Sequence, residues 1–173
     1  MNSFNFNPFP ILKTERLVLR QITMDDLHDF LAIRQNKEVG KYIDRPRSDT
    51  VEEATAFIER ITKAIANNES VLWGITEANS NNIIGTACLF NFSEAKDIGE
   101  IGYELLPQYW SQGYISEAVA MMVDFGFNTL NLVSISAVTH PENKASVKLL
   151  QKNGFVYDNE MDGFSEYVLN RRH

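Results

Sequence analysis

The residues with the clearest chemical potential lie between Glu100 and Phe127, in the run EIGYELLPQYWSQGYISEAVAMMVDFGF. Two carboxylates, Glu100 and Glu104, stand on a strand-like segment that leads into a polar loop ending in Gly113 and then into an apolar helix. A strand, a glycine loop and a helix in this order direct free backbone N–H groups and the positive end of a helix dipole toward an anion. The stretch therefore predicts a binding site for a phosphorylated ligand.

The two carboxylates are candidates for a general base. Because side chains alternate along a strand, Glu100 and Glu104 share one face unless a bulge separates them. Desolvation on a half-buried strand raises the pKa of a carboxylate and suits it to accept a proton near neutral pH. Each could instead be an exposed structural charge. His140, which precedes a proline, is a third candidate, although its position favours a local hydrogen-bonding role.

The loop WSQGYIS is not one of the common nucleotide-binding loops. It lacks the second glycine and the Gly-Lys-Ser/Thr ending of a Walker A motif, and it offers no lysine for the β- and γ-phosphates. It also lacks the further glycines of a dinucleotide-binding fingerprint. A nucleoside triphosphate or a dinucleotide is therefore disfavoured.

The composition limits the classes of protein. The 173 residues fit one domain, 1–173, and 44% hydrophobic with 23% charged residues is ordinary for a globular protein. A net charge of −7 argues against nucleic-acid and anionic-membrane binding, and no apolar run approaches the length of a membrane span. Cys88 is the single cysteine, which excludes a multi-cysteine metal site and favours a buried small side chain. No signal-peptide pattern is present, so we expect a cytoplasmic protein. We also expect no bound metal.

Hydrophobic periodicity divides the chain into strands and helices. It predicts about seven strands, over 14–22, 71–76, 83–92, 97–106, 133–139, 155–158 and 166–170. It predicts about four helices, one starting at Thr23 and the others over 50–67, 114–127 and 143–152. The long helix between strands 97–106 and 133–139 makes a parallel, right-handed βαβ crossover the natural connection, whereas short connections make most other pairs antiparallel. The expected fold class is a mixed α/β (α+β), mostly antiparallel sheet.

Motifs along nearly the whole chain resemble the GNAT superfamily of N-acetyltransferases, and more narrowly its ribosomal-protein N-terminal acetyltransferase branch. They are TERLVLR, EEATAFIE, IIGTACL, EIGYELLPQYWSQGYISEA and HPENKASVKLLQKNGF, in the same order as in the family. The resemblance implies a GNAT-like fold and acetyl-CoA as co-substrate. It also implies transfer of the acetyl group to a primary amine, on a small molecule or a protein N-terminus, and it makes a homodimer plausible.

The resemblance also implies which residues hold coenzyme A. The pyrophosphate would bind the backbone N–H groups of Gln112, Gly113, Tyr114, Ile115 and Ser116. Leu105 and Leu106 would lie beside the pantetheine arm where the two parallel strands separate. Ile115 departs from the family pattern, which has Gly or Ala at this position of the loop.

For catalysis, the resemblance favours Glu100 as the base. The tyrosine that many members use as an acid is replaced by Leu150, and the branch with an Asn-x-x-Ser pattern uses the serine instead, here Ser146. Asn143 would then bind the cofactor or a water, although Asn143 as a helix N-cap with Ser146 three residues later would explain the same pattern. The alternative is a GNAT-fold module that binds acyl-CoA without catalysis.

Overall fold

The computed structural model describes residues 3–46 and 48–172. One sheet has the strand order β1-β2-β3-β4-β5-β6-β8-β7. The strands are β1 (Leu12–Lys13), β2 (Leu17–Gln21), β3 (Val71–Glu77), β4 (Ile83–Phe90), β5 (Ile98–Leu105), β6 (Ser134–Thr139), β7 (Val156–Met161) and β8 (Phe164–Asn170). The α-helices are α1 (Leu27–Gln35), α2 (Lys37–Gly40), α3 (Val51–Ala66), α4 (Tyr114–Asp124) and α5 (Lys144–Lys152).

The predicted fold class is confirmed. β5 and β6 pair in parallel, and every other adjacent pair of strands is antiparallel. The sheet has eight strands rather than about seven because β1, two residues of the N-terminal arm, pairs with β2. A two-residue strand and the four-residue α2 are too short to produce a hydrophobic period, so neither could be predicted from the sequence pattern.

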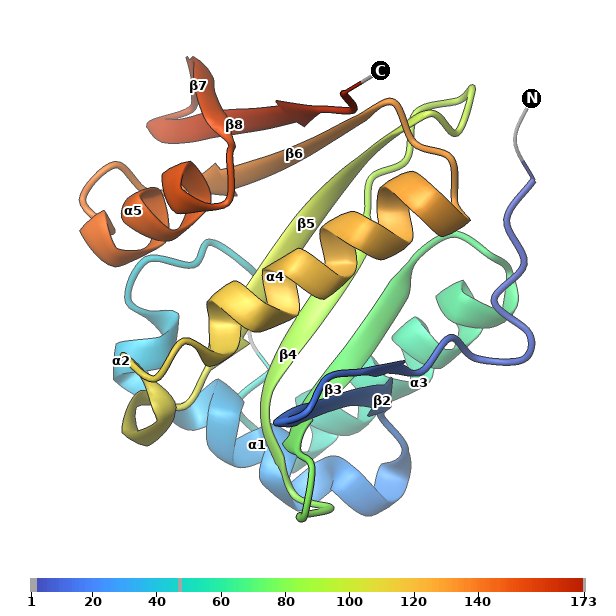
Figure 1. The fold of residues 1–173 in the computed structure, drawn as a ribbon. Coiled ribbons are helices and arrows are strands. Elements are labelled where there is room, and N and C mark those ends of the chain that lie inside the picture. The colour runs from blue at the N-terminus through green and yellow to red at the C-terminus, as the bar shows by residue number, and fades with distance from the viewer. Residues whose placement is uncertain (1–2, 47, 173) are drawn as a thin grey trace.

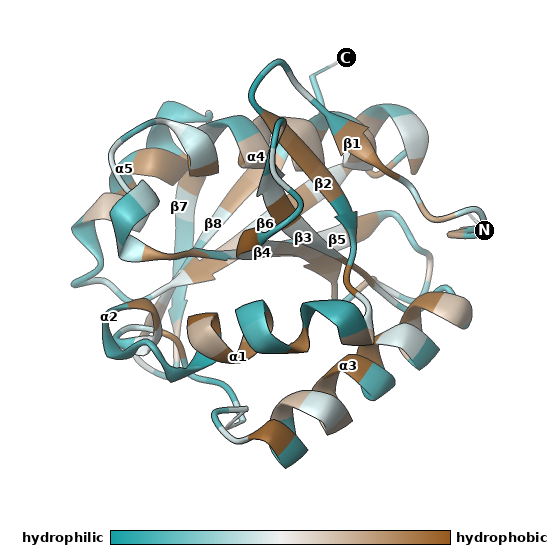
Figure 2. Cartoon of the chain, turned by 90° about the horizontal axis from the view of Figure 1, so that it is seen from below, coloured by the Kyte–Doolittle hydropathy of each residue, from teal (hydrophilic) through white to brown (hydrophobic). Residues whose placement is uncertain are grey.

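Helices cover both faces of the sheet (Figures 1 and 2). α4 and α5 lie on one face, and α1 and α3 lie on the other. The larger core lies under α4 and contains Trp73, Leu89, Ile101, Met122 and Ile135. A second core under α1 and α3 contains Phe30, Ile33, Ile58, Leu72 and Ile83. The sheet therefore separates two apolar layers. A ligand could contact both layers only where two neighbouring strands separate.

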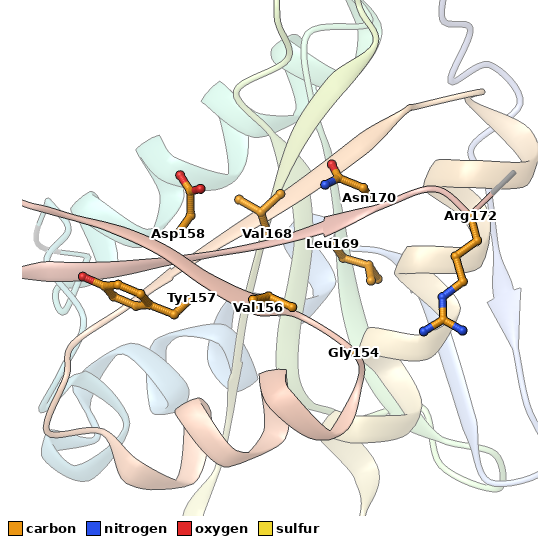
Figure 3. Close-up of a pocket in the computed structure, with 8 residues that line it drawn as sticks. All are labelled: Gly154, Val156, Tyr157, Asp158, Val168, Leu169, Asn170 and Arg172. Carbon is orange, nitrogen blue, oxygen red and sulfur yellow. The ribbon is translucent and has the colours of Figure 1, made fainter.

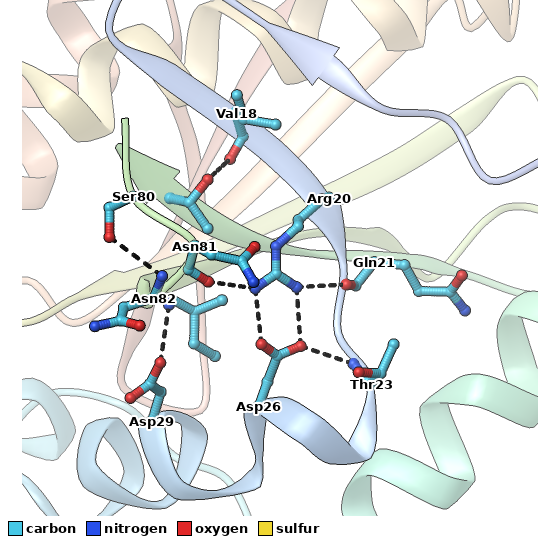
Figure 4. A network of polar contacts seen from close by, with 11 residues as sticks. Val18, Arg20, Gln21, Thr23, Asp26, Asp29, Ser80, Asn81 and Asn82 are labelled. Atoms are coloured by element: carbon cyan, nitrogen blue, oxygen red, sulfur yellow. Dashed lines mark hydrogen bonds and ion pairs between the residues drawn. The ribbon is translucent and has the colours of Figure 1, made fainter. Parts of the chain in front are cut away.

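The local signals in the sequence act where they were expected. Thr50 and Glu53 form the capping box that begins α3. Asp162 and Gly163 have positive φ angles of 51° and 83° and turn β7 into β8. A polar network fixes the start of α1 against the sheet (Figure 4): the guanidinium of Arg20 donates to both carboxylate oxygens of Asp26, at 2.9 and 2.7 Å, and to the carbonyl of Asn81.

The parallel pair separates partway along its length. β5 and β6 pair from Ile98 opposite Ser134 to Ile101 opposite Ala137. Beyond that point β5 stays with β4 as far as Leu105, and β6 stays with β8 as far as Thr139. Figure 1 shows the two strands diverging. Each strand follows its antiparallel neighbour, so their backbones separate, and the region between the diverging strand ends after Ile101 and Ala137 is called the opening below.

Candidate active site

The backbone of β5 faces this opening at Leu105. The N–H of Leu106 donates to the carbonyl of Ile84 in β4, at 2.9 Å. Because backbone groups alternate in direction along a strand, the N–H and carbonyl of Leu105 point the other way, toward the opening. The indole of Trp110 donates to the Leu105 carbonyl, at 2.7 Å. Of the two leucines predicted beside the opening, Leu105 presents backbone to it, whereas Leu106 is hydrogen-bonded to β4 and packs against the second core.

The polar loop ends in a left-handed turn that begins α4. Gly113 is the N-cap with φ 80°, a conformation that glycine adopts without a Cβ penalty. The hydrogen bond from Glu117 N to the Gly113 carbonyl, at 3.0 Å, closes the first turn of the helix. The N–H groups of Tyr114, Ile115 and Ser116 therefore have no partner four residues back within the helix. The predicted order of strand, glycine loop and helix N-terminus is therefore present, and anion binding at this turn stays a prediction.

The departure from the family pattern at Ile115 does not block this turn. The Ile115 side chain is partly buried and packs against the larger core, on the sheet side of the helix. Binding through backbone N–H groups depends on the helix N-terminus and tolerates such a side chain.

Arg16, at the start of the sheet, holds the loop in place. Its guanidinium donates to the carbonyl of Gln112, at 2.9 Å, and to Glu117 Oε2 through two nitrogens, at 2.8 and 2.6 Å. It also lies 4.6 Å from the ring centroid of Tyr114. Sequence reasoning missed this role because the contact joins residues about a hundred positions apart. The only sequence signal was that Arg16 belongs to the TERLVLR motif.

The two carboxylates of β5 share one face, as expected. The register between β4 and β5 is continuous from Glu100 to Leu105, without a bulge. Glu104 is only 6% exposed and forms ion pairs with Arg45 and with Arg34, whose Nε lies 3.1 Å from Glu104 Oε1. Thr86 Oγ1 donates to the same oxygen, at 2.9 Å. Glu104 is therefore engaged in a buried charged network.

Glu100 is in a different environment. It is half-buried, and Asn91 Nδ2 donates a hydrogen bond to its carboxylate, at 2.9 Å. Burial raises the pKa of the Glu100 carboxyl, the nearby charge of Glu166 raises it further, and the hydrogen bond from Asn91 opposes both. A carboxylate with a raised pKa and no cationic partner is the better proton acceptor of the two.

Ser146 lies on the other face of the sheet, in the first turn of α5. Asn143 caps that turn: its Oδ1 accepts from the Ser146 N–H, at 3.2 Å. The Ser146 hydroxyl lies 2.7 Å from the hydroxyl of Tyr103 in β5. Leu150, at the position where many family members have a tyrosine, is fully buried in the core. The structure thus brings a different phenol, from β5, to the serine.

The remaining candidates have structural roles. His140 Nδ1 accepts from the backbone N–H of Glu142, at 3.1 Å, which is the local hydrogen bond expected for a histidine at this turn. Burial raises the pKa of the Cys88 thiol to about 12, so Cys88 stays a neutral, packed side chain. Within residues 3–46 and 48–172, no three His, Cys, Asp or Glu side chains gather as metal ligands, and no helix has the length and apolarity to cross a membrane.

An open hollow of about 430 Å³ lies elsewhere, at the end of the sheet (Figure 3). Its lining side chains come from β7, β8 and the residues that flank them, including Tyr157, Asp158, Val168 and Arg172. None of the predicted site residues lines it. This hollow and the predicted site residues therefore lie in different parts of the fold.

A helix that begins at a left-handed glycine, a half-buried carboxylate on β5 and one parallel pair that diverges are the features that the resemblance to the acetyltransferases led us to expect. Residues 16–156 match the family model for the acetyltransferase (GNAT) domain. The chain therefore belongs to the GNAT acetyltransferase family, and its activity class is that of an N-acetyltransferase.

Similar proteins cover almost the whole chain. The uncharacterized N-acetyltransferase YoaA of Bacillus subtilis (strain 168) is 36% identical over 147 residues, which are 85% of this chain and 83% of YoaA. The ribosomal-protein-S5-alanine acetyltransferase from Vibrio fischeri has the same fold, with a TM-score of 0.79 at 22% identity over 93% of this chain and 96% of its own. RimL, a ribosomal L7/L12 α-N-protein acetyltransferase solved with coenzyme A, has a TM-score of 0.81 at 15% identity over 93% and 98% of the two chains.

Proposed function

We propose that this protein transfers the acetyl group of acetyl-CoA directly to a primary amine within a ternary complex. The acceptor is a protein N-terminal α-amine or the amine of a small molecule. The observation that carries the proposal is the opening between β5 and β6, which has the first turn of α4 beside it and Glu100 on the strand that borders it. A carrier bound at this turn and extending into the opening would bring its acyl group between the two faces of the sheet.

Coenzyme A fits the groups at the opening. Its pyrophosphate would accept hydrogen bonds from the backbone N–H groups between Gln112 and Ser116, where the helix dipole also favours negative charge. Arg16 would hold the loop in the conformation that presents these groups. The Leu105 N–H would pair with an amide of the pantetheine arm, because a strand edge with no neighbouring strand needs other hydrogen-bond partners.

We assign the base to Glu100 rather than to Glu104. Glu104 forms ion pairs with Arg34 and Arg45. If Glu104 accepted a proton from the amine, it would lose the negative charge that these ion pairs need. Glu100 lies on the same face, and burial raises the pKa of its carboxyl, which is the direction that favours a general base. It must be ionised to act, so activity should fall as the pH drops through this raised pKa.

Ser146 is the group that we place near the sulfur of the cofactor, on the opposite face of the sheet from Glu100. Acetyl-CoA supplies the thioester carbonyl and the thiolate leaving group. Asn143 holds the Ser146 backbone through its side-chain oxygen, which leaves its amide nitrogen as the group that would bind the cofactor or a water. A cytoplasmic location and a homodimer remain predictions from the sequence.

Two measurements test the proposal. Acetyl-CoA and coenzyme A should each raise the melting temperature, because a ligand that binds only the folded state stabilises it. Release of free thiol from acetyl-CoA should then depend on an added amine from a panel of N-terminal peptides, polyamines and aminoglycosides. Absence of stabilisation by either compound would overturn the proposal. Binding without turnover across the panel would instead support the non-catalytic acyl-CoA-binding module.

A further inference from the structure

We propose that Tyr103 is a positioning residue that orients the Ser146 hydroxyl toward the sulfur of coenzyme A. The inference rests on the proposed function of the opening. It adds a residue that sequence reasoning did not select, because Tyr103 lies on the opposite face of β5 from the two carboxylates.

Tyr103 is in the part of β5 that borders the opening. The last residue of β5 that pairs with β6 is Ile101, and Tyr103 follows two positions later. Its side chain is on the α4 face, where it packs against the larger core. Its hydroxyl lies 2.7 Å from Ser146 Oγ, in the helix that follows β6. This hydrogen bond therefore joins the two sides of the opening.

The acidity of a phenol favours Tyr103 as the donor in this hydrogen bond. Burial raises the pKa of Tyr103 to about 12, against a smaller opposing effect of Ser146, so the phenol keeps its proton throughout the physiological range. A phenol is a stronger acid, and thus a stronger hydrogen-bond donor, than an aliphatic hydroxyl. When Ser146 Oγ accepts from Tyr103, the hydrogen of Ser146 must point away from the phenol and is available for another acceptor.

That acceptor, in the proposed reaction, is the sulfur. The amine nitrogen forms a bond to the carbonyl carbon, the carbon–sulfur bond breaks with its electron pair going to sulfur, and the amine proton goes to the Glu100 carboxylate. The Ser146 O–H donates a hydrogen bond to the sulfur as negative charge develops there. The thiolate takes its proton from solvent after release. Tyr103 transfers no proton, and its role is to restrict the orientation of Ser146.

Kinetics of Tyr103→Phe, Ser146→Ala and the double variant test the coupling. Tyr103→Phe should lower kcat roughly three- to tenfold, the range expected for loss of one hydrogen bond, with little change in the KM for acetyl-CoA. In the Ser146→Ala background the same change should have no further effect, because Tyr103 acts only through Ser146. Tyr157→Phe, at a half-exposed tyrosine of β7, is the matched control and should match wild type.

Titration of bound coenzyme A gives a second readout that needs no turnover. The ultraviolet absorbance of the thiolate, followed against pH, should show a lower thiol pKa on wild-type protein than in solution, and Tyr103→Phe should reverse part of that shift. The inference is overturned if Tyr103→Phe leaves both kcat and the thiol titration at wild-type values, or if the losses in the two single variants multiply. Bound coenzyme A that titrates normally with no turnover by wild type would overturn the proposed function and this inference together.

Discussion

The two carboxylates of β5 provide the sharpest test of the site, because one is expected to be structural and the other catalytic. Glu104→Gln removes the negative charge between two guanidinium groups. The side chains of Arg34 and Arg45 are 7% and 20% exposed, so water cannot replace the lost partner. Arg34 is further enclosed by the rings of Phe30 and Phe57, at 4.7 and 4.5 Å from the ring centroids.

The expected cost follows from that burial. Removing one partner of a buried ion pair typically costs 3–5 kcal/mol, and a glutamine that keeps the hydrogen bond from Thr86 places the cost near the lower end, about 3 kcal/mol. For a chain of this length, each kcal/mol lowers the melting temperature by roughly 2–4 °C, so Glu104→Gln should melt about 6–12 °C below wild type. Glu100→Gln should stay within about 1 kcal/mol, because a neutral amide avoids the desolvation that raises the pKa of Glu100.

Activity should show the opposite order. Glu100→Gln should lower kcat/KM roughly a hundredfold or more, the usual range for loss of a general base. Glu104→Gln, assayed well below its melting temperature, should keep most of the activity. Urea unfolding by circular dichroism and thiol release on the same preparations make the comparison. If Glu100→Gln is the variant that loses several kcal/mol, or if Glu104→Gln is as stable as wild type, the assignment of the two roles is wrong.

Three further predictions use single residues. Burial alone would raise the pKa of Asp26, but hydrogen bonds from Arg20 and from the Thr23 N–H outweigh it and lower that pKa. The stability that ionised Asp26 contributes is therefore present above pH ~4 and is lost as the pH falls through its folded-state pKa. Asp26→Asn should cost roughly 2 kcal/mol at neutral pH and flatten the acid limb of a plot of unfolding free energy against pH. Glu166→Gln removes a charge that raises the pKa of Glu100, so the acid limb of kcat/KM against pH should move to lower pH, and a shift to higher pH would contradict this. Gly113→Ala should cost roughly 1–2 kcal/mol of stability because of its left-handed φ, and it should weaken coenzyme A binding measured by calorimetry. Gly163→Ala is the control: Gly163 has a similar φ of 83° and open space around it, so this change should cost as much stability and leave coenzyme A binding unchanged.

Local sequence signals predicted much of the fold. The capping box at Thr50, the turn at Asp162–Gly163 and the alternation of β5 depend on residues within a few positions of each other, so their patterns can be recognised in the chain. The same holds for Gly113, because a glycine between a strand and an apolar helix indicates the turn by itself. The short β1 and α2 had no such pattern, and they form because neighbouring segments pair or pack with them.

Three features can be recognised in the sequence alone: the motifs that resemble the GNAT family, the glycine loop that precedes an apolar helix, and the pair of carboxylates on one face of β5. These depend on residue order and on the period of a strand, which are properties of the chain. The difference between the two carboxylates depends on the tertiary structure, because Arg34 and Arg45 reach Glu104 from positions about 60 to 70 residues away. The contacts of Arg16 with the loop before α4 and of Tyr103 with Ser146 also come from the tertiary structure, since long-range contacts of this kind depend on how strands and helices pack and leave no local pattern.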